Sequence, residues 1–144
     1  MEKLERMRWS DELSIGNTNV DKEHKKLLDI YNDLVDLIEL DRDREEFAII
    51  LSKLTDYTLT HFRKEEDYMQ KFSYPDLLVH QGYHSDFMFK VAMFNVDLSG
   101  NNPPDPKNII KFVDKWLINH IMNSDMHYEN YKNEIQSDAT YSEY

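Results

Sequence analysis

The sequence contains no cysteine and only 3 glycines and 4 prolines among its 144 residues. Without thiols, the chain cannot form disulfides, zinc–thiolate sites or iron–sulfur clusters, and it cannot use thiol catalysis. The scarcity of glycine and proline favours long helices over a turn-rich β fold. No run of apolar residues reaches the length of about 18 that a membrane-spanning helix needs, so the sequence predicts no such segment.

Positive charge is also scarce, with 17 basic against 28 acidic side chains and a formal net charge of −11. Phosphate backbones and anionic lipid surfaces repel such a chain, so we expect neither nucleic acid nor membranes among its partners. The first residues, MEKLERMRWSDEL, have no apolar core of the kind found in secretory signals. We therefore expect a soluble cytoplasmic protein.

Hydrophobic residues make up 40% of the chain, which is enough to bury one core. Their helical spacing and three polar breaks predict four helices, over about residues 20–38, 44–72, 76–97 and 107–135. In the second break, FSYPD, we expect Pro75 at the first position of the third helix. The predicted fold class is all-α, an up-down-up-down four-helix bundle. A single domain would span 1–144, with an N-terminal arm over 1–18, the bundle over about 19–135 and a frayed tail over about 136–144.

Each predicted helix carries histidine on its apolar face. These histidines are His24, His61, His80, His84 and His120, and Glu65 lies one turn after His61. Glu65 lies eight residues before Ser73 and His84 lies nine residues after Pro75, which puts both about 12–14 Å from the same turn. In an antiparallel bundle, side chains at such heights meet in one layer of the core.

Two interpretations of this layer compete. A single histidine on an apolar face is most simply a hydrogen-bonded core residue, and a lone HxxxE or HxxxH spacing is a weak motif. Five imidazoles and a carboxylate together, however, would each cost several kcal/mol if left without partners. Mutual hydrogen bonds satisfy two or three of them, whereas a metal satisfies them all. The residues therefore predict a metal site, with iron, copper and zinc all open.

At these positions the chain resembles the hemerythrins, in particular the single-domain bacteriohemerythrins of prokaryotes. The motifs that carry the resemblance are NVDKEHKKL (His24), HFRKE (His61, Glu65), HQGYH (His80, His84) and WLINHIMNSD (His120, Asp125). The resemblance implies two iron ions, ferrous in the deoxy form, bridged by Glu65, Asp125 and an oxo or hydroxo group. One six-coordinate iron would take His80, His84 and His120. The other would take His24 and His61 and keep one open position for dioxygen.

The fourth helix presents one conflict. His120 and Asp125 are five residues apart, about 140° around a regular helix, whereas His127 returns to the face of His120. Spacing alone favours His127 as the ligand. The family pattern places the carboxylate at Asp125, which fits if the helix widens locally as a π-bulge. Tyr128 and Tyr131 would then face inward, and His127 would be a surface residue or lie behind the ligands.

The resemblance also implies a wall for the dioxygen pocket, formed by Phe62, Trp116, Leu117 and Ile121. Each of these residues is, taken alone, an ordinary core residue. The predicted function is reversible dioxygen binding for carriage, storage or delivery, without enzymatic activity. The alternatives are a di-iron redox enzyme or a sensor acting on nitric oxide or peroxide, or iron buffering. The acidic surface is either a docking face for a protein that accepts dioxygen or simply a source of solubility.

Overall fold

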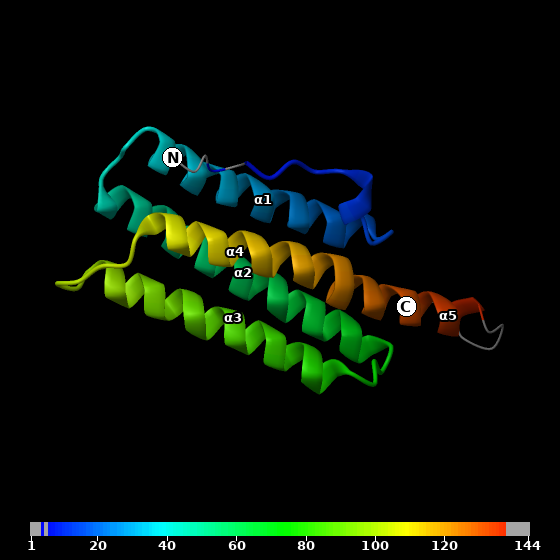
Figure 1. The fold of residues 1–144 in the computed structure, drawn as a ribbon. Helices are drawn as coiled ribbons and strands as arrows, with labels where there is room; N and C mark the ends of the chain where they lie inside the picture. The colour runs from blue at the N-terminus through cyan, green and yellow to red at the C-terminus, as the bar shows by residue number, and fades with distance from the viewer. Residues whose placement is uncertain (1–3, 5, 138–144) are drawn as a thin grey trace.

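Helices account for all the regular structure in the computed structural model, which describes residue 4 and residues 6–137. The elements are η1 (Asp11–Leu13), α1 (Thr18–Glu39), α2 (Arg44–Lys71), α3 (Leu77–Leu98), α4 (Pro106–Asn119), η2 (His120–Asp125) and α5 (Met126–Ser137). α4, η2 and α5 continue one another, so the chain forms four antiparallel rods (Figure 1). This confirms the predicted up-down-up-down bundle.

Side-chain caps explain where three of the long helices begin. Asn17 accepts hydrogen bonds from the backbone N–H groups of residues 19 and 20 at the start of α1. Asp43 and Asp105 cap α2 and α4 in the same way, and Pro106 follows as the first residue of α4. These side chains satisfy N–H groups that have no partner within the helix. The residues just before these three helices therefore contain the signals that start them.

The second turn differs from the prediction in one respect. α3 begins at Leu77, so Pro75 lies in the turn and does not occupy the first helical position. The reason is the backbone of Asp76, whose φ of −98° and ψ of 22° are not helical. The turn itself closes through Ser73, whose φ of 52° lies in the left-handed region. The N–H of Tyr74 then donates to the carbonyl of Met69 over 3.0 Å, as in a Schellman motif.

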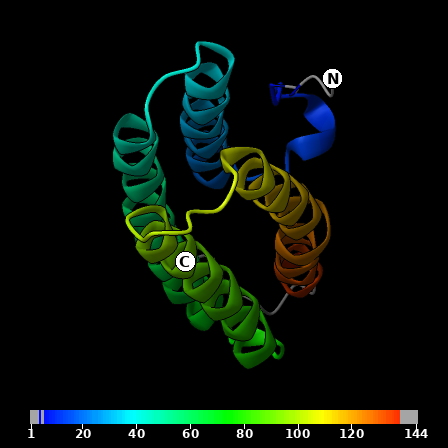
Figure 2. The ribbon, with the colours of Figure 1, turned by 60° about the vertical axis from the view of Figure 1, so that its left-hand side comes forward.

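The N-terminal segment packs along the outside of the bundle, beside α1 and α4 (Figure 2). The backbone of Met7 and the buried side-chain amide of Asn32 on α1 exchange two hydrogen bonds of 2.8 Å. Leu13 and Ile15 are buried in the same core cluster as the helices. Of the predicted tail, residues 136 and 137 belong to α5, and 138–144 lie outside the described residues. The division into a single domain with an arm and a tail stays a prediction.

The core runs along the centre of the four rods. At one end, where α1 and α3 finish and α2 and α4 begin, it consists of apolar side chains. Further along, a layer of buried histidine, glutamate and aspartate interrupts the apolar core, which continues beyond it through Met69 and Phe72. None of the described helices combines the length and the apolar character needed to cross a membrane.

Candidate metal centre

The fourth rod changes its helical geometry between His120 and Asp125, where it forms a π-helix. A π-helix bonds residue i to residue i+5, so a step of five residues returns to the same face. This confirms the local widening predicted from the sequence. Asp125 and Tyr128 are consequently buried, Tyr131 is half-buried, and His127 is exposed and hydrogen-bonded to the hydroxyl of Tyr74.

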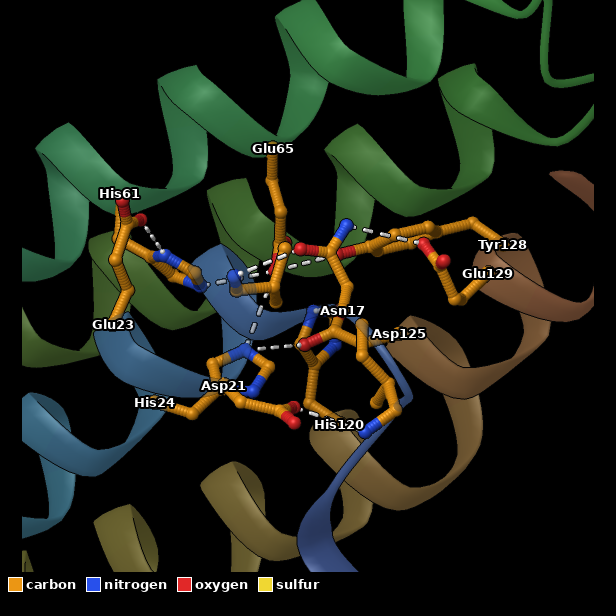
Figure 3. Close-up of polar contacts among 12 residues, drawn as sticks. Asn17, Asp21, Glu23, His24, His61, Glu65, His120, Asp125, Tyr128 and Glu129 are labelled. Atoms are coloured by element: carbon orange, nitrogen blue, oxygen red, sulfur yellow. Dashed lines mark hydrogen bonds and ion pairs between the residues drawn. The ribbon is translucent and has the colours of Figure 1, made fainter. Parts of the chain in front are cut away.

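All seven predicted ligands meet in this layer. They form two groups whose candidate ligand atoms lie within 4.8 Å of one another, namely Glu65, His80, His84, His120 and Asp125 in the first and His24, His61, Glu65 and Asp125 in the second. Every member is buried, and each rod contributes at least one. Figure 3 shows His24, His61, Glu65, His120 and Asp125 converging from three of the rods. The first group contains three imidazoles, the second contains two, and both carboxylates belong to both groups. We call them the three-histidine and two-histidine groups.

Glu65 divides its two oxygens between the groups. Its Oε1 lies 3.1 Å from His84 Nε2 and 3.5 Å from His80 Nε2. Its Oε2 lies 3.0 Å from His61 Nε2 and 3.4 Å from His24 Nε2. Each oxygen therefore faces one pair of imidazoles, as expected for a carboxylate that bridges two cations.

Asp125 does the same from the opposite rod. Its Oδ1 lies 3.1 Å from both His80 Nε2 and His120 Nε2, and its Oδ2 lies 3.1 Å from His24 Nε2. The π-helix makes this possible, because it turns Asp125 and His120 toward the same point. A regular helix would have turned the carboxylate away from the layer.

The site passes a simple test for metal binding. Six buried polar atoms have no hydrogen-bond partner: His24 Nδ1, His24 Nε2, Glu65 Oε1, His80 Nε2, Asp125 Oδ1 and Asp125 Oδ2. Such atoms are costly unless something else binds them. Ligands at about 2.1 Å from a cation and at right angles to each other lie about 3.0 Å apart. The observed separations of 3.0–3.5 Å match that spacing, so these residues fit a metal ion in each group.

The buried histidines and carboxylates of the layer shift one another's pKa values. Burial opposes protonation of the imidazoles, but Glu65 and Glu23 outweigh it at His61 and raise its pKa to about 10. At His80, burial is likewise outweighed by Asp125 and Glu65, which raise its pKa to about 9. Burial opposes ionisation of Glu65, yet the surrounding histidines hold the pKa of this carboxyl well below its usual range. The carboxylates are thus anionic, and a bound cation would replace protons on the imidazoles.

Two further carboxylates support the imidazoles from behind. His61 Nδ1 lies 2.6 Å from Glu23 Oε1, and His84 Nδ1 lies 2.8 Å from Glu66 Oε2. An Nδ1–H that donates to a carboxylate leaves the Nε2 lone pair directed into the layer and makes it more basic. Glu23 and Glu66 were not predicted from the sequence. In the sequence, Glu23 directly precedes the ligand His24 and Glu66 directly follows the ligand Glu65. This adjacency is the only sign of their role, and helical spacing alone does not show whether such a side chain faces the layer or the solvent.

Comparison with known proteins agrees with this geometry. The family model described as the hemerythrin HHE cation binding domain matches residues 16–131. The chain belongs to the hemerythrin family. A bacteriohemerythrin of Clostridium acetobutylicum is 32% identical over 124 residues, which cover 83% of this chain and 96% of that protein. A hemerythrin-like protein of Naegleria gruberi is 31% identical over 121 residues, covering 84% and 89%. The crystal structure of a wild-type hemerythrin superposes with a TM-score of 0.80 at 30% identity, covering 86% of this chain and 95% of that one.

In this hemerythrin, Tyr128 and Glu129 extend the polar layer toward α5. The buried hydroxyl of Tyr128 donates to Glu65 Oε2 over 3.3 Å. Glu129 is also buried, and it accepts a hydrogen bond of 2.8 Å from the hydroxyl of Tyr68 and pairs with Lys132 at 2.8 Å. Asn17 Nδ2 donates to Glu129 Oε1 over 3.4 Å, and Figure 3 shows the two side chains directed toward each other. The burial of Glu129 was not predicted. It depends on the π-helix, which changes the residues of the following helix that face the core.

Of the four predicted pocket residues, Phe62 and Trp116 stack on ligand imidazoles. Phe62 stacks on His84 with ring centroids 3.7 Å apart, and its ring also lies 6.0 Å from that of His61. Trp116 stacks on His120 at 4.4 Å. Leu117 and Ile121 are both buried on the same rod. The two aromatic rings thus shield the three-histidine group most directly, and the role of all four residues in a dioxygen pocket stays a prediction.

Among the cavities that reach the ligands, two border different groups. A cavity of about 400 Å³ on the surface of α3, α4 and η2 reaches Trp116 and His120. A smaller one of about 150 Å³ reaches His61 and Glu65, and it is lined by polar groups that include Glu23 and Lys64. The second cavity borders the two-histidine group, which has fewer protein ligands. A small molecule arriving there would meet the less crowded part of the centre.

Proposed function

We propose that this hemerythrin binds dioxygen reversibly at a di-iron centre held by the two groups. The observation that carries the proposal is the unequal number of imidazoles around two shared carboxylates. The three-histidine group supplies five protein ligands, and the two-histidine group supplies four. The two-histidine group would therefore hold its ion with one protein ligand fewer, which would leave a position there for a small ligand. Ferrous iron, when bound, supplies electrons reversibly to dioxygen at that position.

The chain itself contributes orientation and exclusion of water. Glu23 and Glu66 hold His61 and His84 with their Nε2 atoms directed into the layer. The hydroxyl of Tyr128 holds Glu65 at the bridge. Phe62 and Trp116 cover the imidazoles with apolar rings, which keeps water and protons from the centre. Five neutral imidazoles and two carboxylates donate less charge than glutamate-rich ligand sets, which favours the ferrous state and reversible binding over oxidation of substrates.

An absorption experiment tests this function. Iron-loaded protein is reduced with dithionite, freed of the reductant, exposed to air and then flushed with argon, with iron per chain measured on the same sample. We expect two irons per chain and visible bands that appear in air and disappear under argon. Bands that persist under argon would contradict reversible binding and favour a redox enzyme or sensor. Steady consumption of nitric oxide or peroxide in the presence of a reductant would identify that alternative directly.

A further inference from the structure

The outer face of α3 carries an unusual row of exposed, uncharged residues. Six positions define it, and we call them the α3 stripe: Leu78, Gly82, Ser85, Phe89, Ala92 and Val96. Charged residues make up 31% of the chain, yet the stripe contains none. Leu78 is 82% exposed, Phe89 71% and Val96 65%. Contiguous exposed apolar surface of this kind marks interaction sites more often than isolated apolar residues do.

The residues of the α3 stripe have the spacing found where two helices pack together in a coiled coil. Successive members are 4, 3, 4, 3 and 4 residues apart, which is the a/d pattern of a coiled coil. The ligands His80 and His84 lie on the opposite face of the same helix, so the stripe plays no part in the metal centre. α3 is thus apolar on two faces, and only one of them is used within the bundle.

Gly82 is a second, independent sign that another helix approaches here. Glycine in the middle of a helix is destabilising, because it orders a flexible backbone without adding contacts. Nothing in the described part of the chain requires it, since a Cβ at Gly82 would meet no atom within 4 Å there and its φ is not positive. A glycine on an exposed helix face is explained if a neighbouring backbone packs closely against it.

The stripe is complementary to an inverted copy of itself. A two-fold axis at residue 87 places Leu78 opposite Val96 of the second copy, Gly82 opposite Ala92, and Ser85 opposite Phe89. Phe89 thereby faces the much smaller Ser85, and the pairing of Gly82 with Ala92 allows close approach at two points. On one flank, Lys90 of the second copy lies level with residue 84. Asp86 is two residues away from that level, an offset of about 3 Å along the helix axis. Both residues are exposed, so two symmetric ion pairs can form.

We propose that this hemerythrin forms a dimer in which the α3 stripes of two copies pack antiparallel around residue 87. A surface with a net charge of −11 repels a second copy almost everywhere else, whereas the stripe is free of charge. A single pair of 22-residue helices buries less than the ~1,600 Å² of a standard interface. The association is therefore reversible and weak, with a dissociation constant in the micromolar range.

Light scattering or sedimentation tests the dimer on the metal-loaded protein between about 5 and about 500 µM. We expect the mass to rise from one chain toward two over that range. Phe89→Asp should keep the protein monomeric throughout. The matched control is Ile49→Asp, which alters an equally exposed apolar residue on α2 and should leave the association unchanged. A wild-type protein that stays monomeric, or equal effects of the two variants, would overturn the proposal.

Gly82→Gln separates association from folding. Glutamine is a better helix former than glycine, so the melting temperature should rise. Its side chain would occupy the space that the second helix needs, so the dissociation constant should increase at least about ten-fold. Stronger association in this variant would contradict close packing at Gly82.

Cross-linking tests the register, because the chain has no native cysteine. In the proposed dimer, a cysteine at Ser85 lies about 6 Å along the axis from its symmetry mate, whereas one at Leu78 lies about 27 Å away. A short bismaleimide should therefore link Ser85→Cys and leave Leu78→Cys unlinked. A parallel pair would link both variants, and a different protein partner would link neither; either result overturns the antiparallel dimer.

Discussion

The core of this bundle has two halves that are equally buried and chemically opposite. The apolar half contains Leu34, Leu51, Leu54, Val91, Ile109 and Val113, all with no exposed surface. The metal half, further along the same four rods, contains the five imidazoles and two shared carboxylates. The apolar half contributes its stability by burial alone. The metal half contains six polar atoms without hydrogen-bond partners, which bound cations would satisfy.

This contrast teaches that folding and metal binding depend on different residues of one continuous core. The apolar half fixes the positions of the helices, and the metal half uses those positions to bring its ligands together. Changes in one half should therefore affect stability, and changes in the other should affect metal content. Four experiments test this separation, starting with the largest expected effect.

Asp125→Ala should abolish metal binding most completely, since both groups share this carboxylate. We expect the metal affinity to fall by more than about 100-fold, because supporting residues alone are worth about 10–100-fold. Iron per chain after gel filtration measures the loss. His127→Ala is the matched control, since His127 lies two residues away but is exposed and outside both groups, and it should retain the metal. An Asp125→Ala protein that keeps two irons and its spectrum would refute the ligand assignment.

Leu54→Ala should produce the complementary result. Removing this fully buried side chain should lower the free energy of unfolding by about 2–5 kcal/mol, through lost burial and the cavity left behind. Urea unfolding of the metal-free protein gives that value. Iron per folded chain should stay unchanged, because Leu54 belongs to neither group. Loss of iron from the folded variant would mean that the two halves are not separable.

Glu23→Gln and Glu66→Gln sharpen the comparison within the metal half. Each variant keeps the shape of the side chain but weakens its hydrogen bond to His61 or His84. We expect metal affinity to fall about 10–100-fold in each case. Glu23→Gln should release metal first from the two-histidine group, and Glu66→Gln from the three-histidine group. Stepwise chelator titration distinguishes the two, with Glu45→Gln, an exposed residue of α2, as the control.

The pH dependence of the metal-free protein should give the smallest effect. The pKa values of His61 and His80 are raised to about 10 and about 9 in the folded state, above the ordinary value of 6.5. Their contribution to stability is therefore fully present below about pH 6.5 and is lost as the pH rises through 9 and 10. Urea unfolding at pH 6, 8 and 10 should show this decline. The metal-loaded protein should lack it, because metal replaces the protons; an equal decline in both forms would point to general charge repulsion instead.

The sequence was sufficient to place most of the site because its signals are local. Helical spacing put His61 with Glu65 and His80 with His84, and distances from the turns put them at one height. Spacing was not enough to predict Asp125, because a regular helix favoured His127 as the ligand. Only the family pattern pointed to the widened helix that the structure contains. The start of α3 was misplaced because Asp76 adopts a backbone conformation that the motif FSYPD does not reveal.

The amino-acid sequence alone indicates which residues face the core along each helix, because 100° and 1.5 Å per residue hold within any helix. The rotation and shift of the helices against one another depend instead on how the rods pack in three dimensions. That arrangement selected Glu23 and Glu66 as supports, buried Glu129 beside Lys132, and divided the oxygens of Glu65 between two groups of imidazoles. Contacts between rods depend on how all the side chains of the core pack together, and no local spacing encodes them.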